Sequence, residues 1–323
     1  MTAGERDAPG GAGGYLGVAI SDFGLALETL LPSDAPDAPP RYRSSRFDAP
    51  PTPEAVIARI GEQASAVNVL AGVGLAVWGV VDEVAGSIRD EHFGAEWMGY
   101  PFAERLAARL GAPVCVASGV NAAARAEAER ATEVGPLLYI HIGRTVASAL
   151  VVGGQAVVGA HGAEGRLAHW QTGLAGPRCV CGAEGHLGPL VAAQSQIRLA
   201  IGVAAHDDAT LAAINRVTQD RPETLTAPQL VALARDGIQP LRELVHYAIE
   251  ALALALANLH VTLDPAVIVI GGAFAQVDAI YYIWLRERLD QKLAGVSGRP
   301  TLRPARAGTR AALLGAVSLA ADA

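Results

Sequence analysis

The stretch Val69-Leu-Ala-Gly-Val-Gly-Leu-Ala-Val77 is apolar along its whole length and carries no charged residue. A short apolar run of this kind is typical of a strand that is buried on both faces, as in a parallel sheet covered by helices. Similar runs occur at Val114–Val116 and Val267–Ile270, and segments with helical spacing lie between them. This alternation predicts an α/β fold.

Two sets of meandering strands precede the buried runs. The first set is expected at Tyr15–Ile20, Leu25–Leu31 and Arg41–Phe47, and the second at Leu137–Ile142, Val146–Val152 and Ala156–Val158. In each half of the chain, three such strands are followed by helices that alternate with buried strands. The repeated plan predicts two α/β domains that face a cleft, in which a ligand binds.

Composition excludes several classes of protein. The 323 residues carry a formal net charge of −7, which argues against direct binding of nucleic acid. Three cysteines cannot build the disulfide framework of a small secreted protein. The first 14 residues contain no apolar core of a signal peptide, and Ala248–His260 is shorter than the ~20 apolar residues of a membrane helix. The sequence therefore predicts a soluble, cytoplasmic protein that does not enter a membrane.

Four possible metal ligands gather in a glycine-rich loop. Cys179 and Cys181 are one residue apart, His186 follows, and His169 precedes them by ten residues. Two thiolates and two imidazoles suit tetrahedral Zn²⁺, and four protein ligands leave no open position, so the site would be structural. The alternative is a pair of reduced cysteines in a surface loop with unrelated histidines. Cys115 lies within a predicted strand and is expected to be a buried thiol.

Five segments, in this order and spacing, carry a resemblance to a known family. They are Gly72-Val-Gly-Leu-Ala-Val-Trp-Gly79, Trp97–Val116, Gly159–Leu187, Val267-Ile-Val-Ile-Gly-Gly-Ala273 and Gly308-Thr-Arg-Ala-Ala-Leu-Leu-Gly-Ala316. The chain resembles the ROK family, which groups sugar kinases with sugar-responsive transcriptional repressors. The resemblance implies the two-domain, actin-like fold of sugar kinases and Hsp70, with a cleft between the domains and ATP bound mainly by the second domain. It also implies a homodimer or a higher oligomer.

The resemblance divides the chain into three parts. Residues 1–14 are expected to form a disordered tail, which agrees with their content of Gly, Pro, Ala and Asp. Residues 15–118 together with 305–323 form a small N-terminal domain, because the last helix of the family packs back on the first domain. Residues 119–304 form a larger domain with a zinc loop at 169–188. The family binds zinc through one histidine and three cysteines, and His186 stands here in place of the third cysteine.

The family's catalytic motif is altered. ROK kinases carry Asn-Asp-x-Asn after the strand that corresponds to Val114–Val116, and the aspartate is the general base. This chain has Ser118-Gly-Val-Asn121. Gly119 cannot accept a proton, and the loss of a general base costs ~10²–10⁴ in rate. No catalytic residue is therefore assigned. Ser118 and Asn121 remain candidate ligand-binding residues, although a small polar residue such as Asn121 at the start of an Ala-rich helix is more typical of a helix cap.

The phosphate-binding elements of the family are also altered. Its Asp-x-Gly-Gly-Thr turn is Ala19-Ile-Ser-Asp-Phe23 here, and Asp22 is expected to be an ordinary turn former. Its Gly-Thr-Gly-x-Gly run is Gly143-Arg-Thr-Val-Ala147. The candidate nucleotide-binding residues are Gly143, Arg144, Gly271, Gly272, Ala273 and Gly308. Tight turns between strands and helices explain these glycines equally well, so binding of ATP with Mg²⁺ is doubtful.

The sugar-binding positions have changed as well. The family's Gly-Glu-x-Gly-His is Gly165-Arg-Leu-Ala-His169, and a second family glutamate is Gly188. His169 and Arg166 are the candidate ligand-binding residues that remain in this segment. Arg166 and Arg144 introduce positive charge, which suggests an anionic ligand such as a sugar phosphate. The alternative is that Arg166 pairs with a nearby acid, such as Glu164 or Glu184.

Three hypotheses follow for the function. In the first, the chain is a catalytically inactive homologue of sugar kinases that senses a sugar or a sugar phosphate. The family's repressors carry an N-terminal helix-turn-helix, and the 14 residues before the first strand are too few for one, so any regulation would act through a partner. In the second, the chain is an ATP-dependent kinase for hexoses or N-acetylhexosamines. In the third, it is a purely structural, zinc-containing oligomer.

Overall fold

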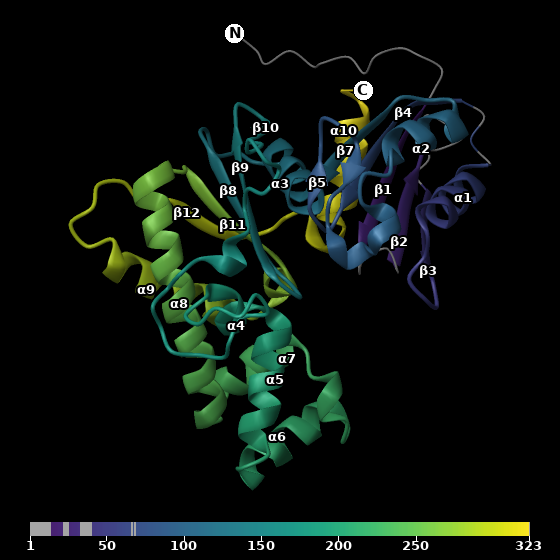
Figure 1. Cartoon of the computed structure of the whole chain (residues 1–323). Helices are drawn as coiled ribbons and strands as arrows, with labels where there is room; N and C mark the ends of the chain where they lie inside the picture. Colours follow the sequence, from purple (N-terminus) through teal and green to yellow (C-terminus); the bar gives the residue numbers. More distant parts are fainter. Residues whose placement is uncertain (1–13, 22–25, 33–40, 66, 68, 323) are drawn as a thin grey trace. The chain divides into compact units, whose positions relative to one another are not determined.

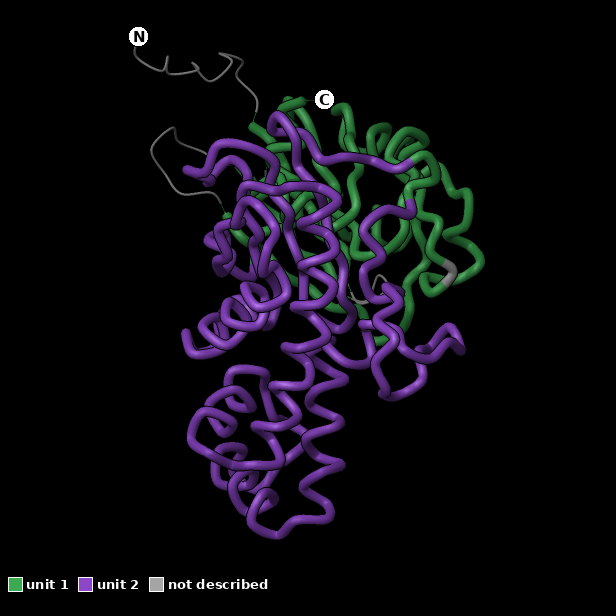
Figure 2. The backbone as a smooth tube through the Cα atoms, turned by 90° about the vertical axis from the view of Figure 1, so that its left-hand side faces the viewer, with its two compact units in different colours: residues 1–126, 160–162, 310–323 green, residues 127–159, 163–309 purple. Residues whose placement is uncertain are grey.

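The computed structural model describes the chain except for residues 1–13, 22–25, 33–40, 66, 68 and 323. The expected tail and the turn around Asp22 therefore lie outside the described residues. The chain forms two compact units (Figure 2): unit 1 comprises residues 1–126, 160–162 and 310–323, and unit 2 comprises 127–159 and 163–309. The domain bounds expected from the sequence stay a prediction, because compactness alone does not show that a unit folds independently.

Unit 1 is built on a five-stranded sheet with the strand order β3-β2-β1-β4-β7. The strands are β1 (Gly14–Ser21), β2 (Ala26–Leu31), β3 (Arg41–Arg46), β4 (Leu70–Val77) and β7 (Val114–Ser118). The pairs β1–β2 and β2–β3 are antiparallel, whereas β1–β4 and β4–β7 are parallel. The apolar run that predicted a buried parallel strand is β4, which lies between two parallel neighbours.

Unit 2 repeats this topology. Its sheet has the order β10-β9-β8-β11-β12, with β8 (Leu137–Ile142), β9 (Val146–Val152), β10 (Gln155–Ala156), β11 (Val267–Gly272) and β12 (Thr301–Pro304). The first three strands pair antiparallel, and β8, β11 and β12 are parallel. The meander followed by parallel strands therefore occurs twice in the chain, as the sequence predicts, and the α/β class is confirmed.

The helices of unit 1 begin and end where local signals place them. They are α1 (Pro53–Ala64), α2 (Phe102–Leu110) and α10 (Ala311–Ala320), together with most of α3 (Gly119–Glu129). The Thr52 hydroxyl accepts a hydrogen bond from the Ala55 amide, and Pro53 occupies the first turn of α1. Gly111 ends α2 in the left-handed conformation, with φ of 66°.

The C-terminal helix α10 packs directly on β1 and β4 of unit 1. Glycines allow this close approach, since a Cβ atom at Gly74 would lie 1.7 Å from the Ala316 carbonyl oxygen. Gly315 lies in the helix itself, and a Cβ atom there would lie 1.7 Å from the Ala122 carbonyl oxygen of α3. The last helix thus belongs to the same unit as the first strand, as the family resemblance implies.

Unit 2 carries a group of helices on one side of its sheet (Figure 1). They are α4 (Leu187–Val191), α5 (Ala193–Ala204), α6 (Asp208–Thr218), α7 (Ala227–Arg235), α8 (Gln239–Leu263) and α9 (Ala279–Lys292). Within the described part of the chain, α8 is the one helix whose length and apolar composition would allow it to cross a membrane. The apolar segment Ala248–His260 singled out in the sequence is part of this longer helix. Over half of its most apolar window is buried in the core of unit 2, which explains the composition.

Three expectations about single elements were wrong, and some elements were not foreseen. Helix α3 begins at Gly119, because the Ser118 hydroxyl accepts a hydrogen bond from the Asn121 amide, so Asn121 is not the cap. The spacing of apolar residues predicts one helix over Pro189–Ile201, but the chain is divided at Ala192, which has extended backbone (ψ 136°). Strand β10 ends at Ala156, before the expected Val158. The sequence analysis also did not foresee α9 or β12, nor the short strands β5 (Val81–Asp82) and β6 (Ser87–Ile88).

Candidate functional site

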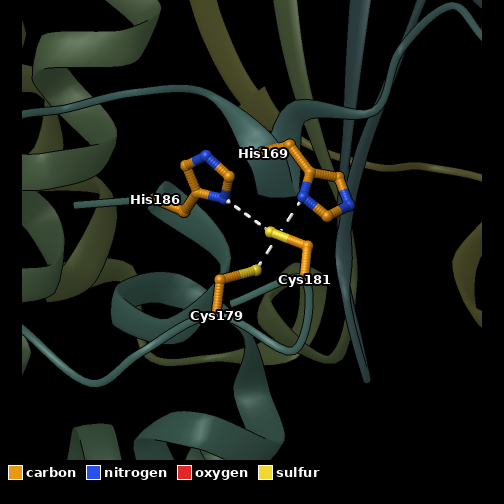
Figure 3. Close-up of side chains that lie close together, drawn as sticks. All are labelled: His169, Cys179, Cys181 and His186. Carbon is orange, nitrogen blue, oxygen red and sulfur yellow. Dashed lines mark hydrogen bonds between the residues drawn. The ribbon is translucent and has the colours of Figure 1, made fainter. Parts of the chain in front are cut away.

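Four side chains of unit 2 meet in one cluster (Figure 3). They are His169, Cys179, Cys181 and His186, the four donors singled out from the sequence. Each offers one ligand atom, and these atoms all lie within 4.8 Å of one another. The structure therefore brings together all four predicted metal ligands.

Backbone hydrogen bonds bring the four residues together. The Gly182 amide donates to the Cys179 carbonyl and the Cys179 amide to the Ala183 carbonyl, which closes a tight turn around the two cysteines. Gly182 has φ of 90°, a conformation that L-residues rarely adopt. His186 faces Gln171 in an isolated β-bridge, two residues from His169. The loop is thus folded back on itself by its own backbone.

The geometry of the cluster fits a zinc ion. Zn–S bonds of ~2.3 Å and Zn–N bonds of ~2.0 Å in a tetrahedron place neighbouring donor atoms roughly 3.3–3.8 Å apart. The Cys179 Sγ to His169 Nδ1 distance is 3.8 Å, and the Cys181 Sγ to His186 Nδ1 distance is 3.4 Å. Two soft sulfurs and two borderline nitrogens are the donor set that structural zinc sites use. The residues present therefore fit this metal.

The electrostatics of the cluster affect its ligands in different ways. Burial and the positive charges of His186 and Arg166 lower the pKa of His169, which favours the neutral imidazole that ligates metals. Burial raises the pKa of Cys179, which disfavours its thiolate as long as no cation is present. A divalent cation would offset this cost, because a coordinating thiol loses its proton.

The second place of interest is the junction of β7 and α3 in unit 1. Ser118 ends the strand, Gly119 begins the helix and Asn121 lies in its first turn, almost completely buried. A Cβ atom at Gly119 would lie 2.6 Å from Cδ2 of the Trp78 indole. The position at which the family resemblance expects a general base therefore has no room for a side chain, because Trp78 packs against it.

A carboxylate that sequence reasoning missed lies at this junction. Oε1 of Glu83 accepts hydrogen bonds from the Ser118 amide, at 3.1 Å, and from Nδ2 of Asn121, at 3.0 Å. Glu83 follows β5 and is half-buried. No motif includes this residue, and its sequence neighbours suggest only a turn. The pairing of the β5–β6 hairpin, which the sequence did not predict, brings the carboxylate to β7.

Gly188, which stands where the resemblance expects a second sugar-binding glutamate, is also closely packed. A Cβ atom at Gly188 would lie 2.9 Å from Cβ of Ala168 and 3.1 Å from the Ala168 carbonyl oxygen. Arg166, which stands at the other glutamate position, is exposed. Of the acids considered as its partners, Glu184 pairs with Arg178, and Glu164 accepts a hydrogen bond from the Gly159 amide.

Three of the six candidate nucleotide-binding residues line one pocket of unit 2. The pocket has a volume of about 480 Å³, within the usual range of ligand sites. Its lining includes Gly143, Arg144 and Ala273, and it adds three polar residues that the sequence did not indicate, Gln194, Thr226 and Gln276. Among the described residues, Gly271, Gly272 and Gly308 do not line this pocket. Its volume would admit a nucleotide, but its walls offer few fixed cations for phosphates.

His141 packs beside two of these glycines. A Cβ atom added to Gly143 would lie 2.6 Å from Nε2 of His141, and one added to Gly272 would lie 2.9 Å from Cε1 of His141. Burial lowers the pKa of His141 to about 4, so the imidazole is neutral at pH 7. The glycines are therefore required at least partly by packing against His141. This agrees with the structural explanation of these residues that the sequence left open.

Comparisons with known proteins identify the family. The ROK family model matches residues 42–323, so the chain belongs to the ROK family. A glucokinase of Streptomyces coelicolor is 24% identical over 290 residues, which cover 86% of this chain and 89% of that protein.

Two solved structures show the same fold. A ROK family glucokinase from Streptomyces griseus, in complex with glucose and AMPPNP, has a TM-score of 0.78 at 19% identity and covers 96% of this chain and 99% of its own. A ROK family transcriptional regulator, a homologue of the E. coli MLC protein, has a TM-score of 0.77 at 20% identity and covers 95% and 78%. The actin-like fold of ROK sugar kinases is confirmed. Both a kinase and a regulator share it, so the fold alone does not choose between these activities.

Proposed function

We propose that this protein is a carbohydrate-binding member of the ROK family that senses a sugar without phosphorylating it. The observation that carries the proposal is the close packing at Gly119, where Trp78 occupies the space that an aspartate side chain would need. Gly188 packs in the same way against Ala168. At both of these glycines a neighbour fills the place of the family carboxylate, so neither of the two losses leaves a cavity.

The proposal includes a structural zinc ion. The donors would be Nδ1 of His169 and His186 and the sulfurs of Cys179 and Cys181. Four protein ligands fill a tetrahedral zinc ion, so the metal would fix the loop and would take no part in a reaction. His169 then serves the metal, which leaves its family role of contacting sugar as a secondary one.

A bound nucleotide is less well supported than the zinc ion. The pocket beside Gly143 and Ala273 is large enough for one, and Arg144 would supply a charge for a phosphate. The glycine-rich cradle of backbone amides that binds phosphates in many proteins is replaced here by Val146 and Ala147. We therefore expect ATP with Mg²⁺ to bind weakly. A homodimer or higher oligomer stays a prediction.

Calorimetric titration of the purified protein tests the proposal. The titrants are D-glucose, N-acetyl-D-glucosamine, N-acetyl-D-mannosamine and AMPPNP with Mg²⁺. We expect at least one of the sugars to bind with a Kd below 1 mM, which is about −4 kcal/mol, and AMPPNP to bind more weakly than that sugar. Lack of binding by all three sugars would contradict the proposal.

A second candidate function is that of an ATP-dependent sugar kinase, and the position of Glu83 favours it. In that case Glu83 would accept the proton of a sugar hydroxyl while its oxygen attacks the γ-phosphorus of ATP and the bond to ADP breaks. The variant Glu83→Gln would then lower the turnover ~10²–10⁴-fold and leave KM for ATP unchanged. If the wild-type protein phosphorylates none of the sugars, the kinase function is excluded.

A further inference from the structure

We propose that Glu83 is the residue that selects the ligand at the β7–α3 junction, by accepting a hydrogen bond from a neutral sugar hydroxyl. The inference rests on the proposed function, because it requires that a carbohydrate binds at this junction. It assigns a role to a residue outside every motif of the sequence, and it states which form of the ligand binds.

The first step of the argument is the position of the carboxylate. Oε1 of Glu83 lies 3.1 Å from the Ser118 amide and 3.0 Å from Nδ2 of Asn121. The resemblance to ROK kinases places the sugar at residues 118 and 121. A hydroxyl group that contacts Asn121 therefore lies no more than about two hydrogen-bond lengths from Oε1 of Glu83, so a hydroxyl on the Glu83 side of the amide can donate to the carboxylate. The carboxylate missing at Gly119 is thus supplied to the same junction from a different loop.

The second step is the rigidity of the loop. The Asp82 carboxylate accepts hydrogen bonds from the amides of Val84, at 3.1 Å, and Ala85, at 2.9 Å, and it pairs with Arg89 across the β5–β6 hairpin. The hydrogen bond from Ala85, and then the charge of Arg89, lower the pKa of Asp82 although partial desolvation opposes them. Asp82 therefore fixes the turn, and the turn holds Glu83 against β7.

The third step is the sign of the charge. An ionised carboxylate accepts hydrogen bonds and donates none, so its partner on the ligand must be a donor such as a hydroxyl group. A phosphate or carboxylate group on the ligand at this point would face a like charge in a half-buried place, which is unfavourable. The exposed arginines Arg144 and Arg166 favour an anionic ligand, but both belong to unit 2. At the unit 1 junction, the charge instead selects an unmodified hydroxyl.

The test compares two variants of the same hairpin. Glu83→Gln keeps the shape of the side chain and an acceptor for the Ser118 amide but removes the charge. Arg89→Gln removes the ion pair to Asp82 and leaves Glu83 intact, so it reports on the hairpin alone. Both variants and the wild type are titrated by calorimetry with D-glucose, N-acetyl-D-glucosamine and N-acetyl-D-mannosamine and with the 6-phosphate of each, and their melting temperatures are compared.

We expect Glu83→Gln to weaken binding of the sugar about 10- to 100-fold, as for the loss of a hydrogen bond to a charged group, and to melt close to the wild type. Arg89→Gln should bind within about twofold of the wild type. For the wild type, each free sugar that binds should have a lower Kd than its 6-phosphate. In Glu83→Gln the ratio of these two dissociation constants should be closer to one.

Two results would overturn the inference and leave the proposed function intact. One is a wild-type protein that binds a sugar while Glu83→Gln binds it equally well, or while Arg89→Gln is weakened as much as Glu83→Gln. The other is tighter binding of a 6-phosphate than of its free sugar. A wild-type protein that binds none of the six compounds contradicts the proposed function itself, and the inference with it.

Discussion

The zinc loop and the β7–α3 junction both stand at places where the ROK resemblance expects chemistry, yet their substitutions differ in kind. At the loop, His186 replaces a cysteine and remains a metal donor, and the four donor atoms still lie within 4.8 Å of one another. At the junction, Gly119 replaces an aspartate and no donor remains at that position. In our proposal the loop keeps its ability to bind a metal, whereas the junction no longer carries the base that phosphoryl transfer requires.

The largest effect is expected at the loop. Cys179→Ser should reduce the zinc content from about one ion per chain to nearly none, because the hard hydroxyl is a poor replacement for a buried thiolate. Cys115→Ser is the matched control, since Cys115 lies in β7 outside the cluster. Its zinc content should equal that of the wild type. Elemental analysis of protein purified without chelator measures the zinc content of both variants. A wild-type protein without zinc would show that the loop binds no zinc, which would contradict our proposal for the loop.

A smaller effect is expected when the lost residue is restored at the junction. Gly119→Asp should destabilise the protein by about 3 kcal/mol, since its Cβ atom would overlap the Trp78 indole. The double variant Trp78→Ala with Gly119→Asp should recover part of this loss, so that the two effects are not additive. Urea unfolding measures the free energies. Additive effects would show that the indole does not fill the place of the missing base.

The smallest effect is expected when the pH is lowered. It extends the comparison to a third place, the glycine turns beside His141. Burial lowers the pKa of His141 to about 4 in the folded protein, whereas the ordinary pKa of histidine is near 6.5. The contribution of the neutral imidazole to the free energy of unfolding is therefore complete above pH 6.5. This stabilisation is lost as the pH falls from 6.5 toward 4, since only the unfolded chain takes up the proton. Between pH 6.5 and pH 5 we expect a loss of about 1.5 kcal/mol.

The variant His141→Gln isolates this effect in urea unfolding at the two pH values. It should lose about 1.5 kcal/mol less than the wild type over this interval. His206→Gln, which changes an exposed histidine of the same unit, should follow the wild type. If the wild type and His141→Gln respond equally to acid, His141 is not held neutral by its surroundings.

Much of the fold could be predicted from local patterns. The apolar run of β4 and the strand β8 each report a local preference, and the structure has them close to where they were expected. Strand β12 was missed because it is short and ends in proline. Its Arg303 is buried and forms two ion pairs. Nη1 lies 2.9 Å from Oε2 of Glu127, and Nε lies 3.0 Å from Oε1 of Glu133. Pairing of this kind over long sequence distances leaves no trace in hydrophobic periodicity.

The candidate site was predictable to a different degree in its two parts. The zinc donors lie within 18 residues of one another and two glycines permit the turn, so spacing alone indicated the cluster. At the junction, the sequence showed that a base was absent but not what had replaced it. Trp78 and Glu83 come from a segment about 40 residues earlier, and their contacts with Gly119 and Asn121 depend on the pairing of β4 with β7.

The most direct test of the central claim is an assay of phosphoryl transfer by the wild-type protein, purified without chelator. ATP with Mg²⁺ is mixed with the sugar that binds most tightly, and the sugar phosphate is quantified by mass spectrometry over several hours. We predict no product above a protein-free control. Product formed at about 1 s⁻¹, the lower end of kinase rates, would contradict the claim that this junction no longer carries a working base.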